Sequence, residues 1–276
     1  MARIVGRCPQ PCSDQLQSAS SSISTSNEAS SGTANTGWRW LTLVARREAP
    51  LKELADELAG KHGIRAEVIT ADLTDFDART AIATRLAELG LSVSILVNNA
   101  GLSTSGPVYR SDPVREVAMI RTDVEAVAHL CSVFLPQMAE RRSGGVLNVA
   151  STAAFQPLPG QAGYGGSKAF VLSYSHALRA ELAKVGVTVT VLCPGPVPTS
   201  FGETAGFTKE EAEGSLPKFM WVDPDDVARQ TVDGLEKGRR VVIPGVSNRV
   251  GAAFGYMLPR RVLLPILSRQ HPALRK

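Results

Sequence analysis

Short apolar runs alternate with longer amphipathic segments from residue 38 onward. Apolar runs of this length, bounded by turn residues, predict strands, and strands covered on both faces are almost continuously apolar. The predicted strands are WLTLVA (40–45), RAEVITADL (65–73), VSILVNNAG (93–101), GGVLNVAS (144–151), VTVTVLCPG (187–195) and RVVIPG (240–245).

Helical spacing characterises the segments between these runs. Leu51, Leu54 and Leu58 share one face of a helix that ends at Gly63. The other predicted helices cover residues 75–90, 112–140 with an interruption near Pro136, and 164–184. Strands alternating with helices predict an α/β fold: a single-domain, Rossmann-like, doubly wound parallel sheet with helices on both faces. Such sheets bind ligands at the carboxyl ends of their strands.

Residues 1–37 differ in composition from the rest of the chain. Nine serines fall between positions 13 and 31, and large apolar residues are few. Such a segment cannot bury enough apolar surface to offset the entropy lost on ordering, so we expect low complexity and disorder. The Rossmann-type domain is expected to span residues 38–250, followed by an apolar and basic C-terminal segment at 251–276.

The overall composition narrows the class of protein. A length of 276 residues suits one large domain, and a net charge of +4 does not indicate a nucleic-acid partner. No run approaches the ~20 apolar residues that span a bilayer, and the N-terminus lacks the apolar core of a secretory signal. Cys8 and Cys12 have no Cys or His cluster nearby, which argues against a metal site. Cys131 and Cys193 lie in apolar runs, as expected for a cytoplasmic protein.

The stretch STAAFQPLPGQAGYGGSKAF (151–170) combines groups suited to proton transfer. Tyr164 and Lys168 are four residues apart and share one helical face, and Ser151 follows a predicted strand. A nearby ammonium favours the ionised form of a phenol, so this pair can serve as a general acid and base. The spacing also occurs in ordinary helices, but its position after a strand ending in serine favours the catalytic interpretation.

Residues 38–258 resemble the short-chain dehydrogenase/reductase family. The resemblance is carried in order by Asp72, NNAG (98–101), Ser151, Tyr164, Lys168 and PGPVPT (194–199). It implies a nicotinamide cofactor and reversible hydride transfer between that cofactor and a carbonyl or alcohol. By the resemblance, Tyr164 is the acid and base, Lys168 binds the nicotinamide ribose, and Ser151 orients the carbonyl.

The resemblance also implies contacts to the cofactor. Asp72 and Leu73 would flank the adenine, and Val197 and Thr199 would contact the nicotinamide amide. The other implied contacts are Asn98, Ala100, Gly101, Tyr164, Lys168, Pro194 and Gly195.

The residues after the second strand position bear on the choice of cofactor. An acidic residue there would bind a ribose 2′-hydroxyl, whereas arginine accepts a 2′-phosphate. The chain has Arg46 and Arg47 at this place and no acidic residue before Glu48. The sequence therefore favours NADP(H) over NAD(H).

Asp123 is the first departure from the family pattern. The family usually has Asn at this place on the long helix, and its backbone carbonyl holds a water in the proton relay to the lysine. A backbone role survives a change to Asp. The added charge either changes how readily Lys168 ionises or pairs with it, and the sequence leaves both outcomes open.

The N-terminal region departs further from the family pattern. The family begins with a strand, a T-G-x-x-x-G-x-G turn whose backbone approaches the pyrophosphate, and a helix. SNEASSGTA (26–34) lacks the first and last glycines of that turn, and only three residues separate it from Trp38. ARIVG (2–6) lacks the apolar length of a first strand. We infer that residues 4–36 are aberrant sequence replacing these elements, which would expose two strand edges, weaken NADPH binding and reduce stability.

The C-terminal third completes the sequence-based picture. It resembles reductases related to ketoacyl and steroid dehydrogenases, with residues 201–220 placed as a substrate lid. Residues 250–270 form either a helix docked on the body or a contact with a membrane surface or hydrophobic substrate.

Three functions remain open. The first is an NADP(H)-dependent oxidoreductase that acts on a small-molecule carbonyl or alcohol, with a hydrophobic keto substrate favoured. The second is a catalytically impaired relative that acts as a partner subunit. The third is a peripheral lipid-binding protein. Family members pair through the helices at 112–140 and 164–184, so a homo-oligomer is expected.

Overall fold

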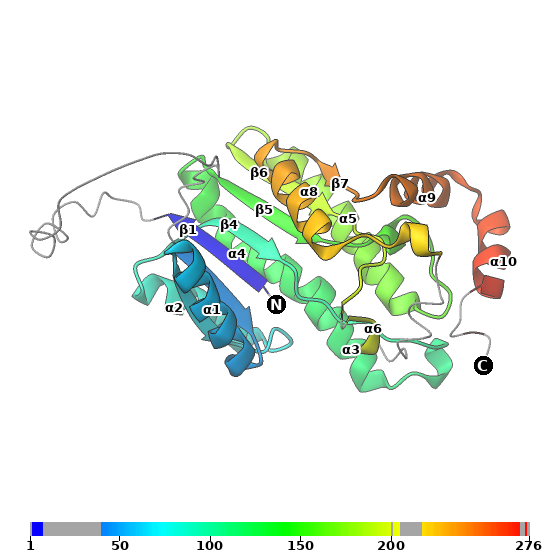
Figure 1. Cartoon of the computed structure of the whole chain (residues 1–276), viewed down its shortest axis with the longest axis horizontal. Coiled ribbons are helices and arrows are strands. Elements are labelled where there is room, and N and C mark those ends of the chain that lie inside the picture. The colour runs from blue at the N-terminus through cyan, green and yellow to red at the C-terminus, as the bar shows by residue number, and fades with distance from the viewer. Residues whose placement is uncertain (1, 8–39, 200, 205–216, 271–273, 275–276) are drawn as a thin grey trace, which may run out of the picture.

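The structure, a computed structural model, describes residues 2–7, 40–199, 201–204, 217–270 and 274. These residues form a seven-stranded sheet with the strand order β3-β2-β1-β4-β5-β6-β7 (Figure 1). The strands are β1 (Ala2–Arg7), β2 (Trp40–Ala45), β3 (Arg65–Thr70), β4 (Ser92–Asn98), β5 (Gly144–Val149), β6 (Val187–Leu192) and β7 (Val241–Val242).

Helices follow the strands along the chain. The α-helices are α1 (Glu48–His62), α2 (Phe76–Glu88), α3 (Pro113–Ile120), α4 (Ala126–Glu140), α5 (Ala162–Leu182), α6 (Phe201–Thr204), α8 (Pro224–Glu236), α9 (Val246–Met257) and α10 (Arg260–Gln270). Shorter helical segments are η1 (Val108–Arg110), η2 (Arg121–Glu125), η3 (Thr152–Phe155) and η4 (Lys218–Met220).

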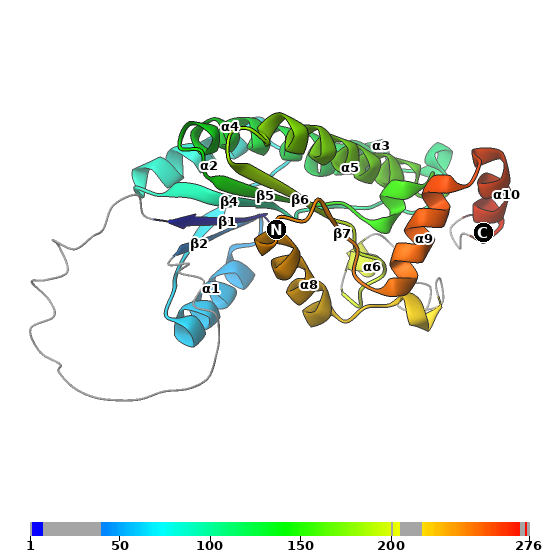
Figure 2. The ribbon, with the colours of Figure 1, turned by 90° about the horizontal axis from the view of Figure 1, so that it is seen from above.

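Helices cover both faces of the sheet, as the alternating pattern predicts. Helices α2, α4 and α5 lie on one face, and α1 and α8 lie on the other (Figure 2). The pairs β2–β3, β4–β5, β5–β6 and β6–β7 are all parallel. The prediction of a Rossmann-like α/β fold is confirmed, and the parallel strands direct their carboxyl ends toward one edge of the sheet.

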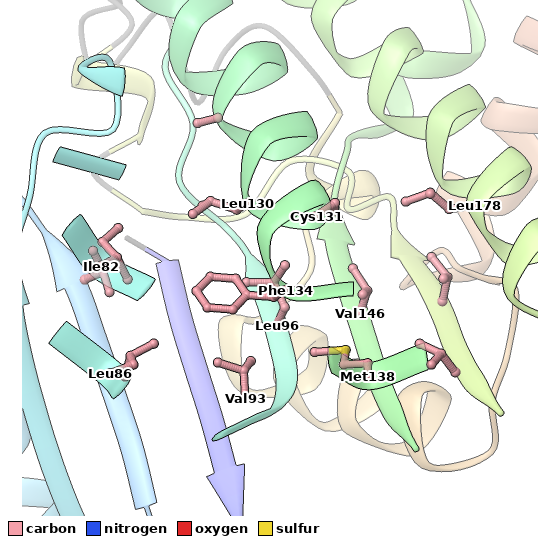
Figure 3. Close-up of a cluster of buried hydrophobic side chains, with 14 of the residues drawn as sticks. Ile82, Leu86, Val93, Leu96, Leu130, Cys131, Phe134, Met138, Val146 and Leu178 are labelled. Carbon is pink, nitrogen blue, oxygen red and sulfur yellow. The ribbon is translucent and has the colours of Figure 1, made fainter. Parts of the chain in front are cut away.

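The largest apolar cluster lies between the sheet and helices α2, α4 and α5 (Figure 3). Leu130 and Phe134 of α4 lie close to Leu96 of β4, and Ile82 and Leu86 extend the cluster from α2. Full burial of a side chain of this size stabilises the fold by about 1.5–3 kcal/mol. This cluster therefore holds α2 and α4 on the sheet and fixes the loops that follow β3 and β4.

Strand β1 lies in the middle of the sheet, between β2 and β4, where the sequence pattern predicts no strand. It pairs antiparallel with β2 on one side and with β4 on the other. The expectation of two exposed strand edges is therefore wrong. Backbone groups form a ladder in either strand direction and need no long apolar run, so six residues suffice.

The reversed direction of β1 places its two ends at opposite edges of the sheet. Ala2 pairs with Val44 near the carboxyl end of β2, whereas Arg7 pairs with Ser92 at the amino end of β4. The rest of the predicted low-complexity segment, including the partial glycine turn at 26–34, lies outside the described residues. So do residues 205–216 of the predicted lid.

The long helix predicted for residues 112–140 is interrupted at a different place. The chain makes a π-helical segment at η2, which buries Thr122 and Asp123, and α4 then continues through Pro136. Proline frees the carbonyl four residues earlier, here that of Ser132. Both Pro136 and Ser132 are exposed, so water can satisfy that carbonyl and the helix persists.

The C-terminal helices lie at the carboxyl edge of the sheet (Figure 2). Helix α9 packs inward through Asn248, Ala252 and Gly255, and α10 buries Leu263. Arg260 donates a hydrogen bond to the Gly255 carbonyl at 3.1 Å, which ties the start of α10 to α9. Across the described ranges, no helix has the length and apolar character needed to cross a membrane.

Proline at position 4 tests the central place of β1. Ile4 pairs with Thr42 and with Leu96, so Ile4→Pro removes a backbone N–H from the middle of the sheet. We expect it to lower the free energy of unfolding in urea by about 3 kcal/mol or more. Ile4→Val keeps the N–H and should cost less than about 1.5 kcal/mol. A proline variant as stable as the parent would contradict a central β1.

Candidate active site

A cavity of about 1330 Å³ opens at the carboxyl edge of the sheet. Its walls come from the ends of β2, β3, β4, β5 and β6 and from the first turns of α1 and α5. The predicted site residues that line it are Arg46, Arg47, Asp72, Leu73, Ala100, Gly101, Ser151, Tyr164, Lys168, Pro194, Gly195, Val197 and Thr199. One cavity thus gathers every predicted site residue except Asn98.

One end of the pocket holds a tyrosine, a lysine and a serine. Tyr164 and Lys168 lie on successive turns of α5, with Lys168 Nζ 5.6 Å from the centre of the Tyr164 ring. Ser151 follows β5, and its Oγ accepts a 3.1 Å hydrogen bond from the Ala153 backbone N–H. That bond leaves the hydroxyl hydrogen of Ser151 able to donate to a ligand oxygen.

Lys168 forms a buried ion pair with Asp123. Its Nζ lies 2.9 Å from Asp123 Oδ2 and donates to the Val149 carbonyl at 3.3 Å. Asp123 Oδ1 accepts a 2.7 Å hydrogen bond from the Leu102 backbone N–H, and Oδ2 accepts a 3.5 Å bond from the Ser167 hydroxyl. The sequence left open whether Asp123 pairs with Lys168 or changes how readily Lys168 ionises. In the structure the two side chains form an ion pair.

This ion pair is buried and closely packed. Burial raises the pKa of Asp123 above its ordinary value, against the opposing effects of the Lys168 charge and the Leu102 N–H. A Cβ atom at Gly101 would lie 3.1 Å from Lys168 Nζ. Only glycine therefore lets the backbone after β4 approach the pair without displacing it.

Two arginines and an aspartate stand at the other end of the pocket. Arg46 and Arg47 follow β2 and are exposed, and Asp72 follows β3. Asp72 Oδ1 accepts 2.9 Å hydrogen bonds from the backbone N–H and the hydroxyl of Thr74. Burial raises the pKa of Asp72, but these bonds and the Arg46 charge outweigh it and leave the pKa below its ordinary value. The carboxylate is therefore ionised and held in place at neutral pH.

The distance between the two ends follows from the strand order. Strands β1 and β4 separate β2 from β5, which makes three steps across the sheet. At about 4.8 Å a step, the ends of β2 and β5 lie roughly 14 Å apart. A pocket of this width can hold an extended ligand that reaches from Arg46 to Tyr164.

Arg79 supports the wall of the pocket, although it belongs to no sequence motif. Its side chain is fully buried on α2, where it donates to the Leu73 carbonyl at 2.6 Å and pairs with Glu125 of η2. It therefore fixes the backbone at the predicted adenine contact. The signal in the sequence is a charge on an apolar helical face, since Arg79 shares its spacing with Ile82 and Leu86.

Asn248 supports the loop after β6 in a similar way. Its Nδ2 donates to the carbonyls of Met220 and Pro244, both at 3.0 Å. A Cβ atom at Gly195 would lie 2.3 Å from Asn248 Oδ1, so the loop can pack on this amide only through glycine. Pro194 anchors the same loop by accepting a 2.9 Å hydrogen bond from the Thr152 N–H.

Asn98 does not line the pocket, and the neighbouring Asn99 does. Asn98 is buried at the end of β4, where its Nδ2 donates to Asn148 Oδ1 at 2.8 Å. Asn148 in turn donates to Ser175 Oγ at 2.9 Å. Successive residues of a strand point to opposite faces, so position 98 joins the interior and position 99 faces the cavity.

The described cysteines are poorly suited to nucleophilic chemistry, and the metal-binding residue types do not cluster in the described ranges. Burial raises the pKa of the Cys131 and Cys193 thiols to about 12, so both are protonated at neutral pH and are poor nucleophiles. Among the residues that the structure describes, no group of three or more His, Cys, Asp or Glu could hold a metal ion.

Known sequences resemble this chain at moderate identity. The Probable oxidoreductase EphD of Mycobacterium tuberculosis is 34% identical over 207 residues, which cover 70% of this chain and 35% of EphD. The chain thus spans about a third of the length of EphD. The very-long-chain 3-oxoacyl-CoA reductase of Anas platyrhynchos is 30% identical over 243 residues, covering 85% of this chain and 73% of that protein.

A solved structure resembles this fold. The short-chain dehydrogenase from Sphingobium yanoikuyae, determined in complex with NADPH, matches with a TM-score of 0.69 and 29% identity. The match covers 81% of this chain and 84% of that protein.

The family comparison agrees with the fold and with the contents of the pocket. The sequence profile described as short chain dehydrogenase matches residues 24–209, which is more than half of the chain. Its match begins ahead of the stretch at 26–34 that was compared with the glycine turn. With the sheet order, the shared pocket and these relatives together, the chain belongs to the short-chain dehydrogenase family.

Proposed function

We propose that this protein is an NADP(H)-dependent oxidoreductase that transfers hydride between nicotinamide and a hydrophobic carbonyl or alcohol. One observation carries the proposal: Ser151, Tyr164 and Lys168 line the same pocket as Arg46 and Arg47. The first group suits proton transfer at a carbonyl, and the second suits a phosphate on ribose.

The chain's own residues supply the proton chemistry. In the direction of reduction, the Tyr164 hydroxyl gives its proton to the carbonyl oxygen as that oxygen gains charge. The Ser151 hydroxyl donates to the same oxygen and holds it in place. The Lys168 ammonium, 5.6 Å from the centre of the Tyr164 ring, stabilises the phenolate that remains and can hold the nicotinamide ribose. A bound nicotinamide supplies or accepts the hydride.

The charges after β2 favour NADP(H) over NAD(H). Arg46 and Arg47 line the pocket, and the only nearby acid along the chain, Glu48, forms a 2.5 Å ion pair with Lys52 on α1. The Glu48 carboxylate is therefore already paired with Lys52 on the surface of α1. The NADPH bound to the Sphingobium relative agrees with this preference.

The walls around Tyr164 favour an apolar substrate. The described lining residues at this end include Leu158, Phe201, Met220, Trp221 and Leu267. Lys168 is the only charged side chain among the described residues of this end, and Asp123 already pairs with it. A sulfonate or phosphate substrate would lack a free cation here. An acyl or ring ketone fits better, in agreement with the name of the Anas relative.

Pairing with a second copy and a cytoplasmic location remain predictions. Val114, Val117 and Ile120 of α3 and Phe170 of α5 expose large apolar side chains. They lie on the helices through which family members pair, which supports a homo-oligomer.

The C-terminal helices support a second candidate activity, contact with an anionic membrane surface. Residues 237–276 contain nine Lys and Arg and no Asp or Glu, although the whole chain is only +4. On α9, Val246, Val250, Phe254 and Met257 follow helical spacing and are 70%, 50%, 60% and 78% exposed. An apolar stripe within a cationic segment matches the boundary between acyl chains and anionic headgroups.

Turnover tests the main proposal. Consumption of NADPH with a panel of aliphatic and cyclic ketones should be measurable, and Tyr164→Phe should lower kcat by about 10²–10⁴-fold. Calorimetry on both proteins should give the same NADPH affinity. Binding of NADPH without turnover by the parent would favour the impaired partner subunit instead. An absence of NADPH binding would support the expected defect at the front end.

Removal of the arginines tests the cofactor preference. The double variant Arg46→Ala/Arg47→Ala should bind NADPH at least about 100-fold more weakly, because each of two charged hydrogen bonds to phosphate contributes about 1.5–3 kcal/mol. Its affinity for NADH should hardly change. Arg85→Ala on α2, whose side chain pairs with Glu88 on the surface, is the matched loss of charge. Equal losses for both cofactors would contradict a 2′-phosphate contact.

Vesicle sedimentation tests the membrane contact. The protein should pellet with vesicles of phosphatidylcholine and phosphatidylglycerol, less with pure phosphatidylcholine, and less again at high salt. Phe254→Glu/Met257→Glu should abolish pelleting. The control Val232→Glu alters an exposed apolar side chain on α8 and should pellet like the parent. Equal pelleting by all three proteins, or by none, would overturn this surface.

A further inference from the structure

Asp123 and Lys168 form a buried ion pair inside the proposed active site. Their side chains are 0% and 5% exposed, and the carboxylate oxygen lies 2.9 Å from the ammonium nitrogen. The two residues come from different elements, η2 and α5. Opposite charges at this distance in a poorly solvated place largely cancel each other's field at longer range.

The geometry of Asp123 is fixed on every side. The Leu102 N–H donates to Asp123 Oδ1, and the Ser167 hydroxyl shares Oδ2 with Lys168. The backbone of Gly101 packs against the pair. The π-helical turn of η2 brings the carboxylate into this position. The ion pair is therefore built into the fold rather than formed by a mobile surface side chain.

The charge on Lys168 matters because Tyr164 is beside it. An uncompensated ammonium 5.6 Å from the ring would strongly favour the phenolate. With Asp123 ionised, the phenol faces an ion pair rather than a lone cation. Among the described residues, the Glu116 carboxylate of α3 also lies close to this place, against Gly163 next to Tyr164. Cys193 after β6 stays neutral because burial raises its pKa to about 12. The charges of Arg46 and Asp72 lie beyond two strands, at the far end of the pocket.

We propose that Asp123 is a positioning residue that balances the charge of Lys168 beside Tyr164 and so favours carbonyl reduction over alcohol oxidation. The proposal rests on the proposed function. In reduction, the Tyr164 O–H bond breaks and a new O–H bond forms on the substrate oxygen. A bound nicotinamide would supply the hydride that the carbonyl carbon gains. Solvent then reprotonates the phenolate. Oxidation needs the phenolate at the start, and a Lys168 charge that Asp123 balances stabilises the phenolate less than a lone ammonium would.

The pH range follows from the sign of the charge. Burial raises the pKa of Asp123, but the shift is opposed by Lys168, Leu102 and Ser167. Above that pKa the carboxylate is charged and balances the ammonium of Lys168. The balance is lost as the pH falls through the pKa of Asp123, because the protonated carboxyl group carries no charge.

Asp123→Asn tests the proposal, because asparagine keeps an oxygen for the Leu102 N–H and removes the charge. The near-ultraviolet absorbance of tyrosinate is titrated with pH in the absence of cofactor and substrate. Subtracting the same titration of Tyr164→Phe, made in each background, isolates Tyr164. We expect Tyr164 in Asp123→Asn to ionise at a pH lower by about one unit than in the parent. The ratio of oxidation to reduction rates at neutral pH should rise about tenfold.

Glu125→Gln provides the matched control, since it removes a carboxylate two residues away in η2 that pairs with Arg79 and not with Lys168. It should leave the Tyr164 titration unchanged. If Asp123→Asn fails to give the native circular dichroism spectrum, Asp123→Ser replaces it with the same expected shift. Identical Tyr164 titrations in parent and variant would overturn the proposal. A shifted Tyr164 titration in a protein that turns over no substrate would contradict the proposed function but support the charge balance.

Discussion

The hydrogen-bond ladder through β1 is the constraint on which the pocket depends. Strands β2 and β3 carry Arg46 and Asp72, whereas β5 and β6 carry the residues around Ser151. Nothing in the described sheet joins these two halves except β1, which pairs with β2 and β4 at once. The separation of the two ends of the pocket is therefore set by one short strand whose direction is opposite to that of its neighbours.

The π-helical segment η2 links the same two ends in a second way. Asp123 reaches Lys168 on α5, and Glu125, two residues later, reaches the buried Arg79 on α2. Arg79 holds the Leu73 carbonyl at the edge predicted to face adenine. One irregular turn thus supplies a counter-charge to a buried cation at each end of the pocket. Local departures of this kind are often retained at functional sites because they direct side chains that a regular helix would turn elsewhere.

Much of the fold followed from the sequence because parallel sheets impose a strong pattern. The apolar runs from WLTLVA to RVVIPG became β2 to β7, since strands covered on both faces must be apolar. The grouping of Ser151, Tyr164 and Lys168 was also predictable, because two of them share a helical face and the third ends a strand. These features depend on local periodicity, which a single sequence contains.

The remaining features depend on partners that periodicity does not specify. Strand β1 is held by backbone hydrogen bonds, which leave no apolar signature, and so its place in the sheet was missed. Whether Asn98 or Asn99 faces the pocket depends on the residue at which β4 ends. The position of η2 within the long helix depends on how Asp123 and Glu125 meet cations from other helices. Each of these is decided by contacts between segments far apart in the chain.

The reversed direction of β1 also has a practical consequence for handling the protein. Ala2 pairs with Val44, two residues before the pocket residue Arg46, so this end of β1 lies close to the pocket wall. Leu267, close to the end of α10, belongs to the pocket wall. An affinity tag or fluorescent label joined close to Ala2 therefore starts beside residues that line the pocket. An exposed site at the opposite edge of the sheet, such as Lys61 at the end of α1, is the better point of attachment.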